Sequence, residues 1–179
     1  MPFKFERTSI PDVVAIEAKA FSDERGLFKE TFKKSEFQSY GIQTEFVQDN
    51  VSKSQKNVLR GLHFQRDPYA QGKLVGVMKG EVIDVAVDLR KGSKTYGKYV
   101  SIKLNEDNNT MLWVPPGFAH GFIALEETIV HYKVTKEYNK DSEGGIIWND
   151  PLVNVNWPID NPLLSSKDEV WGTSKGVYL

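Results

Sequence analysis

Short stretches of alternating apolar and polar residues dominate the chain and predict β-strands. In the run 81–89, Ile83, Val85 and Val87 fall on one face, because successive side chains of a strand point to opposite sides. Further strands are predicted over residues 75–78, 100–104, 111–114, 122–125 and 128–134. Closely spaced short strands separated by polar turns are typical of an antiparallel sandwich or barrel, so we predict an all-β fold.

The segments between these strands predict turns. Lys79 and Gly80 separate two apolar runs and predict a hairpin, and the polar run 105–109 predicts a turn. No internal repeat, low-complexity tract or linker interrupts the 179 residues. A chain of this length can bury one sizeable core, so we predict a single domain over residues 1–179.

Helix is scarce in the pattern. Ser35 is the expected N-cap of a short helix over residues 36–40, and Gly41 is expected to end it. From Asp150 onward, three prolines predict a mostly irregular chain with one helical turn near residues 162–167.

Composition narrows the classes of function. The formal net charge is -1, with acidic and basic residues interspersed, and this pattern favours neither nucleic acid nor a membrane as a partner. Cysteine is absent, which excludes disulfides and thiolate chemistry. The N-terminus lacks a signal-peptide profile, and no apolar run approaches the roughly 20 residues of a membrane span. We therefore expect a cytoplasmic protein.

Two segments carry the candidate chemistry. Arg60 and His63 stand in an Arg-Gly-Leu-His sequence, Lys73 follows ten positions after His63, and His120 lies in the segment 115–122. Three imidazole or carboxylate ligands are the usual minimum for catalytic zinc or iron, so two histidines predict no metal site. Nearby cations favour the neutral form of a histidine, which can accept a proton. A lone histidine is usually a hydrogen-bonded structural residue, and the pattern adds acid–base chemistry by His63 as an alternative.

Several longer motifs resemble those of a known family. Among them are Asp23-Glu24-Arg25-Gly26, Phe46-Val47-Gln48-Asp49-Asn50, Leu59-Arg60-Gly61-Leu62-His63, Ala70-Gln71-Gly72-Lys73, Gly117-Phe118-Ala119-His120-Gly121-Phe122, Trp148-Asn149-Asp150-Pro151 and Ser166-Lys167-Asp168. From about Ile10 to Asp168 the chain resembles the dTDP-4-dehydrorhamnose 3,5-epimerases, which are dimeric, metal-independent cupins. The resemblance implies a cupin jelly-roll β-barrel, a homodimer without cofactors, and conversion of dTDP-4-dehydro-6-deoxy-D-glucose to dTDP-4-dehydro-L-rhamnose.

The resemblance also implies roles for individual residues. His63 matches the base that removes a proton next to the ketone, and Asp168 matches the carboxylate that orients and charges this histidine. Tyr132 matches the acid on the opposite face of the sugar, and Lys73 matches a cation beside the reacting carbonyl. Substrate contacts are implied for Phe21, Arg25, Glu30, Gln48, Asp49, Asn50, Arg60, Lys73, His120, Tyr138, Glu143 and Lys167. Tyr138 matches an aromatic residue that stacks on the thymine ring in the family, where some contacts near the positions of Arg25 and Glu30 come from the partner subunit.

The implied reaction explains these residue types. Removing a proton next to a carbonyl places negative charge on the carbonyl oxygen, and an ammonium group in a dry pocket stabilises that charge more effectively than it would in water. A positioned base contributes on the order of 10²–10⁴-fold. Inversion requires reprotonation from the other face, and repetition at carbons 3 and 5 gives a redox-neutral double epimerisation.

Simpler interpretations stay open for some residues. Tyr132 shares a strand face with Val130 and Val134, so the alternation alone also fits a packing role. Asp84 is either a solvated strand residue or, as we favour, a partner of Lys73. His131 projects to the opposite face from Tyr132 and is expected at the surface.

Three other functions also fit the sequence. The alternatives are an epimerase that inverts one carbon, a non-catalytic nucleotide-sugar-binding cupin, and a metal-dependent oxygenase or isomerase.

Two parts of the chain depart from the family pattern. Asn57 stands where the family commonly has glycine, which predicts a left-handed turn. The tail after Asp168, with Trp171 and Tyr178, resembles the family least, and the sequence assigns it no function.

Overall fold

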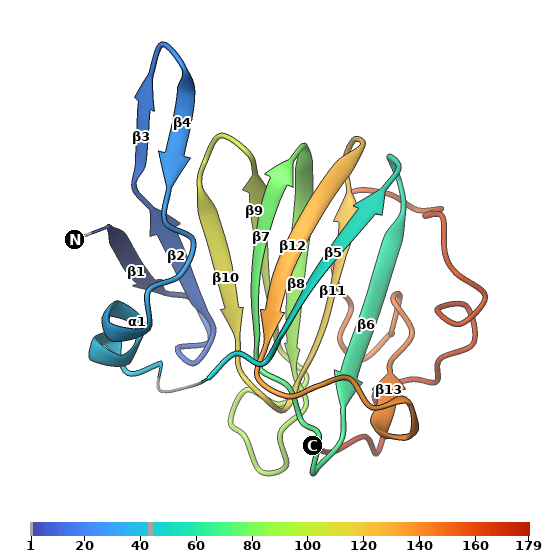
Figure 1. The fold of residues 1–179 in the computed structure, drawn as a ribbon. Helices are drawn as coiled ribbons and strands as arrows, with labels where there is room; N and C mark the ends of the chain where they lie inside the picture. Colours follow the sequence, from blue (N-terminus) through green and yellow to red (C-terminus); the bar gives the residue numbers. More distant parts are fainter. Residues whose placement is uncertain (1, 43–44) are drawn as a thin grey trace.

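Two antiparallel sheets face each other and form the barrel (Figure 1). The computed structural model describes residues 2–42 and 45–179. The six-stranded sheet has the order β1 (Phe3–Arg7), β2 (Val14–Ala18), β10 (Thr110–Val114), β7 (Lys73–Lys79), β12 (Thr128–Val134) and β5 (Gln48–Ser54). The five-stranded sheet has the order β13 (Glu143–Gly145), β6 (Leu59–Gln65), β11 (Phe118–Ala124), β8 (Glu81–Asp88) and β9 (Tyr99–Asn105). The predicted all-β, jelly-roll fold is confirmed.

The remaining elements lie outside the barrel. Strands β3 (Ala20–Asp23) and β4 (Gly26–Lys29) form a hairpin that projects away from the barrel in Figure 1. Helix α1 (Lys34–Tyr40) lies beside β1 and β2, and a 3-10 turn, η1 (Lys140–Ser142), precedes β13. Neither helix in the described part of the chain is long and apolar enough to cross a membrane.

The barrel interior is apolar because the inner faces of both sheets alternate as the sequence predicts. Val75 of β7 and Val130 of β12 pack in the same buried cluster as Val82 and Ala86 of β8. The odd-numbered residues of β8 point outward, and Val85 is completely buried there. Both faces of β8 are therefore covered, one by the opposite sheet and one by the C-terminal segment.

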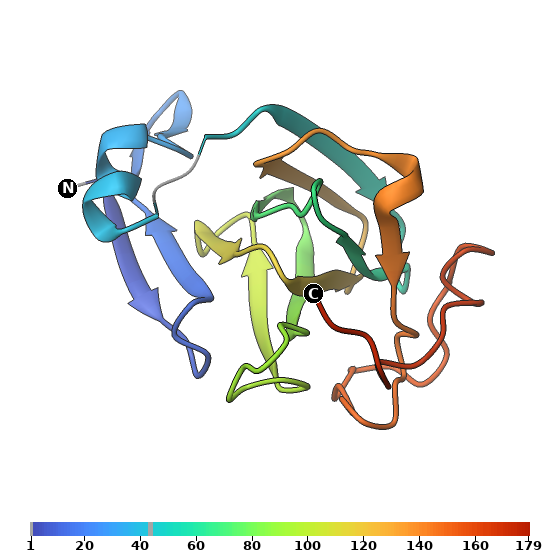
Figure 2. The ribbon, with the colours of Figure 1, turned by 90° about the horizontal axis from the view of Figure 1, so that it is seen from below.

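The C-terminal segment covers the outside of the five-stranded sheet. Val153, Val155 and Trp157 pack with Leu59 and Leu62 of β6 in a second buried cluster. Figure 2 shows this segment, coloured orange to red, along one side of the barrel, with β1 and β2 on the other. On that other side, a third cluster joins Phe37 of α1 to the outer face of the six-stranded sheet. Each sheet of the barrel thus carries a packed apolar layer on its outer face.

One predicted hairpin is wrong. Strand β7 pairs with β10 and β12, whereas β8 pairs with β9 and β11, so Lys79 and Gly80 carry the chain from one sheet to the other. Gly80 has a φ of 78, and a Cβ there would meet the Glu127 carbonyl oxygen at 2.4 Å. The apolar pattern shows where a strand lies but not which strand it pairs with.

Helix and loop predictions are partly correct. Helix α1 begins at Lys34 after an extended Lys33, so Ser35 is not its N-cap, and Gly41 ends it in the left-handed region as predicted. Asn57 has a φ of 69, which confirms the predicted left-handed turn. The segment after Asp150 is irregular, as predicted, but residues 162–167 contain no helical turn, because Leu163 bridges Val58 in extended chain.

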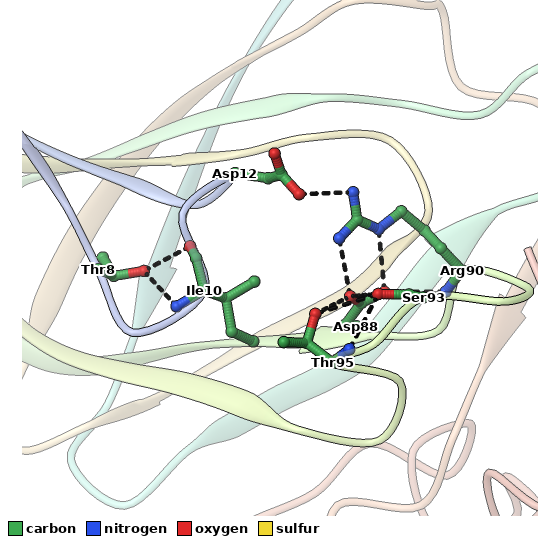
Figure 3. A network of polar contacts seen from close by, with 7 residues as sticks. All are labelled: Thr8, Ile10, Asp12, Asp88, Arg90, Ser93 and Thr95. Carbon is green, nitrogen blue, oxygen red and sulfur yellow. Dashed lines mark hydrogen bonds and ion pairs between the residues drawn. The ribbon is translucent and has the colours of Figure 1, made fainter.

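A buried carboxylate ties the lower loops of the barrel together (Figure 3). Asp88 is fully buried at the end of β8 and accepts hydrogen bonds from Arg90, Ser93 and Thr95. Burial alone raises the pKa of Asp88, but these hydrogen bonds outweigh it and lower the pKa to about 2. Arg90 also reaches Asp12 at 2.8 Å, which joins the turn after β1 to the loop after β8.

We expect Asp88→Asn to lower the free energy of unfolding at pH 7 by about 2–4 kcal/mol, because Arg90 loses a buried anionic partner. The folded pKa lies below its ordinary value of 3.8, so this stabilisation is present above about pH 4 and is lost as the pH falls toward 2. Chemical denaturation at several pH values measures the difference. Asp12→Asn, which removes an exposed partner of Arg90, should cost less than about 1 kcal/mol. Equal losses in both variants would contradict this account.

Candidate active site

A polar cavity of about 430 Å³ opens between the inner faces of the two sheets. Strands β5, β7 and β12 supply one wall, and β6, β11 and β13 supply the other. Most of the predicted site residues line it, namely Gln48, Asn50, Arg60, His63, Lys73, His120, Tyr132, Tyr138, Glu143, Lys167 and Asp168. Residues separated by up to 120 positions in the chain therefore meet in one space.

A β-bulge places Arg60 and His63 on the same wall. The two residues are three positions apart, so regular alternation would point them to opposite faces. The register of β6 against β11 shifts between the pairs His63–His120 and Arg60–Phe122, which turns both side chains toward the cavity. At this bulge β6 comes very close to β11. Gly61 allows the contact, because it has a φ of 137 and a Cβ there would lie 2.6 Å from the Gly121 Cα.

His63 and Asp168 form a hydrogen-bonded dyad. The His63 Nε2 lies 2.5 Å from Asp168 Oδ1, and the Ser165 hydroxyl donates to Asp168 Oδ2 at 2.9 Å. Burial raises the pKa of Asp168, but the bonds from His63 and Ser165 outweigh burial and hold it below its ordinary value. An ionised Asp168 accepts a hydrogen bond from Nε2–H, which leaves Nδ1 of His63 as the ring nitrogen able to accept a proton.

Tyr132 lies on the wall opposite His63. Its strand, β12, belongs to the six-stranded sheet, where Tyr132 is the cross-strand neighbour of Asn50 and Val75. The ring packs against the edge of the apolar core and also lines the cavity. Burial raises the pKa of the phenol, and the cationic Arg60 and Lys167 offset part of this effect. The phenol therefore holds its proton at neutral pH.

Lys73 brings a desolvated ammonium group to the same cavity. Burial lowers its pKa from 10.5 to about 8, although Asp84 and Glu143 act in the opposite direction. The Nζ atom lies 3.5 Å from the His63 carbonyl oxygen. Lys73 remains protonated at neutral pH, but it is much closer to titration than an exposed lysine.

The partner predicted for Asp84 is wrong. Asp84 is fully buried, so it is not a solvated strand residue, and its Oδ1 lies 2.7 Å from the Nε2 of His120 rather than in an ion pair with Lys73. Lys73 still feels the charge of Asp84 through space. His120 is the cross-strand neighbour of His63 on β11, and this position brings it, rather than Lys73, within hydrogen-bonding reach of Asp84.

Three polar residues are connected at the mouth of the cavity. Glu143 accepts hydrogen bonds from the Tyr138 hydroxyl at 3.0 Å and from Lys167 Nζ at 2.6 Å. The ring of Tyr138 is half exposed, and its backbone N–H donates to the side chain of Gln48. Glu143 thus positions both a flat aromatic surface and a cation beside the opening.

Four predicted contact residues do not line this cavity. Phe21 and Arg25 lie on the projecting β3–β4 hairpin, and Glu30 directly follows it. Asp49 points away from the cavity, because it alternates with the inward-facing Gln48 and Asn50, and its carboxylate pairs with Lys133 at 2.7 Å. The cavity of this chain is thus formed without these four side chains.

Asp49 also meets the third histidine of the chain. His131 lies on the outer face of β12, as predicted from the alternation, and its Nε2 is 3.9 Å from an Asp49 oxygen. It is partly covered there rather than fully exposed. Within residues 2–42 and 45–179, no group of three or more His, Cys, Asp or Glu residues is arranged to hold a metal ion.

The sequence did not identify several residues that shape the site. Ser52, Gln65, Gln71 and Phe122 line the cavity, and Ser165 supports Asp168. Ser52 was recognisable, because it continues the alternation of Gln48 and Asn50 along β5. A serine three residues before Asp168 is a pattern that stabilises turns, and it could have indicated Ser165.

We expect Lys73→Met to raise the free energy of unfolding at pH 7 by about 1–3 kcal/mol, because methionine removes a poorly solvated charge. The folded pKa of about 8 lies below the unfolded value of 10.5, so stability of the native protein rises with pH between these values. The advantage of the variant should therefore shrink over that range in chemical denaturation. Lys79→Met, at the exposed end of β7, should change stability by less than about 0.5 kcal/mol. A Lys73→Met protein less stable than the native one would refute the argument.

Comparison with known proteins identifies the family. Residues 7–175 match the family model described as dTDP-4-dehydrorhamnose 3,5-epimerase. The chain is 54% identical over 164 residues to the enzyme of that name from Shigella flexneri, covering 90% of this chain and 91% of the relative. The Sulfolobus tokodaii enzyme superposes with a TM-score of 0.93 at 45% identity, covering 99% of both chains. The Legionella pneumophila enzyme in complex with dTDP-4-keto-L-rhamnose gives a TM-score of 0.94 at 43% identity, covering 98% of this chain and 94% of that one. This chain belongs to the dTDP-4-dehydrorhamnose 3,5-epimerase family.

Proposed function

We propose that this protein is a 3,5-epimerase that converts dTDP-4-dehydro-6-deoxy-D-glucose to dTDP-4-dehydro-L-rhamnose. The observation that carries the proposal is that His63 and Tyr132 come from facing sheets and line one cavity. A hexulose ring between them has a base on one side and an acid on the other. Family membership supports the same substrate and reaction.

Proton removal is the task of His63. The free Nδ1 removes a proton from the carbon next to the ketone. The two electrons of that C–H bond stay with the substrate and form the enolate. Asp168, bonded to Nε2, stabilises the imidazolium that forms and prevents the ring from turning. Asp168 therefore stabilises the positive charge that His63 gains when it takes the proton.

Lys73 stabilises the enolate. Its ammonium group is desolvated, so its interaction with a developing oxyanion is stronger than that of an exposed lysine. The charge is present below about pH 8, which covers the neutral range. His120, fixed by Asp84, supplies a further polar group from the opposite wall.

Tyr132 completes the inversion. Its phenol keeps its proton because burial raises the pKa, and it delivers this proton to the opposite face of the same carbon. Proton exchange with solvent then restores both groups. Repetition at the second carbon gives the doubly inverted product, and the overall reaction involves no net oxidation or reduction.

The nucleotide binds at the mouth of the cavity in this proposal. The half-exposed Tyr138 ring offers a stacking surface for thymine, and Arg60 and Lys167 offer positive charge to the diphosphate. Glu143 holds Tyr138 and Lys167 in place.

We also propose that the protein is a homodimer. Phe21, Leu27 and Phe28 on the β3–β4 hairpin are 51%, 57% and 67% exposed, which is unusual for three large apolar side chains on one short hairpin. If a second copy of the chain covers this hairpin, Arg25 and Glu30 of the first copy approach the cavity of the second. This arrangement accounts for the predicted contact residues that the cavity of one chain lacks.

We expect His63→Ala to lower kcat by about 10²–10⁴-fold while leaving dTDP affinity nearly unchanged, because the base does not bind the nucleotide. Product formation measures the first quantity and calorimetry with dTDP the second. His131→Ala, on the outer face of β12, serves as the matched control and should retain native kcat. Native turnover by His63→Ala would remove His63 from the mechanism.

We expect Tyr132→Phe to retain exchange of substrate hydrogen but to lose inversion, because His63 still removes the proton and only the opposite-face acid is missing. Deuterium incorporation from heavy water at carbons 3 and 5, compared with the yield of inverted product, measures this difference. For the native enzyme, incorporation is expected at both carbons. Incorporation at one carbon alone would instead identify a single-carbon epimerase. An unchanged rate of inversion in Tyr132→Phe would exclude the phenol as the acid.

A further inference from the structure

The catalytic carboxylate belongs to an irregular segment rather than to a strand. Asp168 is almost fully buried, yet its backbone is held by a local turn in which its N–H donates to the Ser165 carbonyl at 2.9 Å. After this turn the chain is anchored again where the Gly172 carbonyl accepts from the Ile147 N–H at 2.8 Å. Trp171 lies between these two anchors.

Trp171 packs directly beside the dyad. Its ring centroid lies 6.3 Å from that of His63, and the two rings meet edge to face at 67°. The indole occupies the space above Gly145, where an added Cβ would lie 2.6 Å from the ring. Gly145 is the cross-strand neighbour of His63, so the missing side chain at position 145 makes the room that Trp171 fills. Trp171 does not line the cavity and therefore stands behind the dyad.

The indole N–H is buried and lacks a hydrogen-bond partner among the described residues. A buried donor without a partner is costly, so a nearby acceptor with spare capacity is favoured. The Asp168 carboxylate accepts one bond at each oxygen, from His63 and Ser165, and each oxygen can accept a second. Trp171 is also among the causes that lower the pKa of Asp168, so its N–H lies near the carboxylate although it falls short of a full hydrogen bond.

We propose that Trp171 is a positioning residue, which holds the Asp168 carboxylate and the His63 ring in the orientation that proton removal requires. The ring limits rotation of His63 from behind, and the indole N–H is directed to the carboxylate. The proposal deepens the epimerase function proposed above and rests on it. It gives a role to the C-terminal tail.

Trp171→Phe tests the proposal, because it keeps an aromatic ring and removes the N–H. We expect kcat to fall about ten-fold with KM within about twofold, since the substrate does not touch this side chain. Trp157→Phe is the matched control. It also removes an indole N–H from a buried ring, but this N–H donates to the Trp148 backbone carbonyl at 2.8 Å rather than facing the dyad. This control should lose stability and keep native kcat.

Gly145→Ala gives a second test that leaves Trp171 in the chain. The added methyl group displaces the indole from its position, so the same loss of kcat is expected. A rise in KM at native kcat in either variant would overturn the proposal, because it would make Trp171 a substrate contact. Native kcat and native KM in both variants would overturn it as well.

Nuclear magnetic resonance of the free protein separates this proposal from the proposed function. The ¹⁵N shifts of the His63 imidazole report its hydrogen bonding without substrate. We expect Trp171→Phe to change them and Trp157→Phe to leave them as in the native protein. Unchanged His63 shifts in Trp171→Phe would refute the positioning role, even if the native protein has no epimerase activity. A change of the His63 shifts in Trp171→Phe, together with no turnover by the native protein, would refute the proposed function alone.

Discussion

The packing of one sheet against the other is the constraint on which the site depends. Apolar side chains fill most of the space between the sheets, and at one end polar residues replace them and leave a cavity. The filled part fixes the distance between the two walls, because close-packed interiors resist compression and expansion. Groups mounted on opposite walls therefore keep a fixed separation. His63 and Tyr132 are such a pair, so a ring-shaped substrate between them can be approached from both sides.

The charges in this cavity are kept in place by polar neighbours. Asp84 and Asp168 are both almost completely buried, and each lies within hydrogen-bonding distance of a histidine. A buried carboxylate without such a partner would be strongly disfavoured. For Lys73, the nearby charges of Asp84 and Glu143 offset only part of the cost of burial, so the pKa of its ammonium group stays lowered. A site that is costly in the empty protein is a common property of enzymes, since stability and activity place different demands on the same residues.

The sequence predicted much of the fold because alternation along a strand has a direct physical cause. Residues of β8 and β12 lie on the faces that their spacing indicates. Pairing was not predictable in this way, so the chain between β7 and β8 was wrongly expected to form a hairpin. Alternation also separates Asp49 from Gln48 and Asn50, and it could have warned against placing all three in one cavity.

The site itself was less accessible to such reasoning. The bulge that aligns Arg60 with His63 depends on contact with Gly121 in another strand, and no local pattern reveals it. The dyad joins residues that are 105 positions apart. Here only the resemblance to a family supplied the pairing. Trp171 was not indicated at all, because its contact with His63 depends on the absence of a side chain at Gly145.

The location of Asp168 on irregular chain has a thermodynamic consequence. Segments held by few hydrogen bonds open at a lower free energy than the strands of a barrel, so a protein can lose part of its structure without unfolding. When residues 165–172 detach, His63 loses its anionic neighbour while both sheets remain intact. We therefore expect heat or denaturant to abolish activity before the barrel unfolds, and the contacts of residues 165–172 to set the margin between the two events.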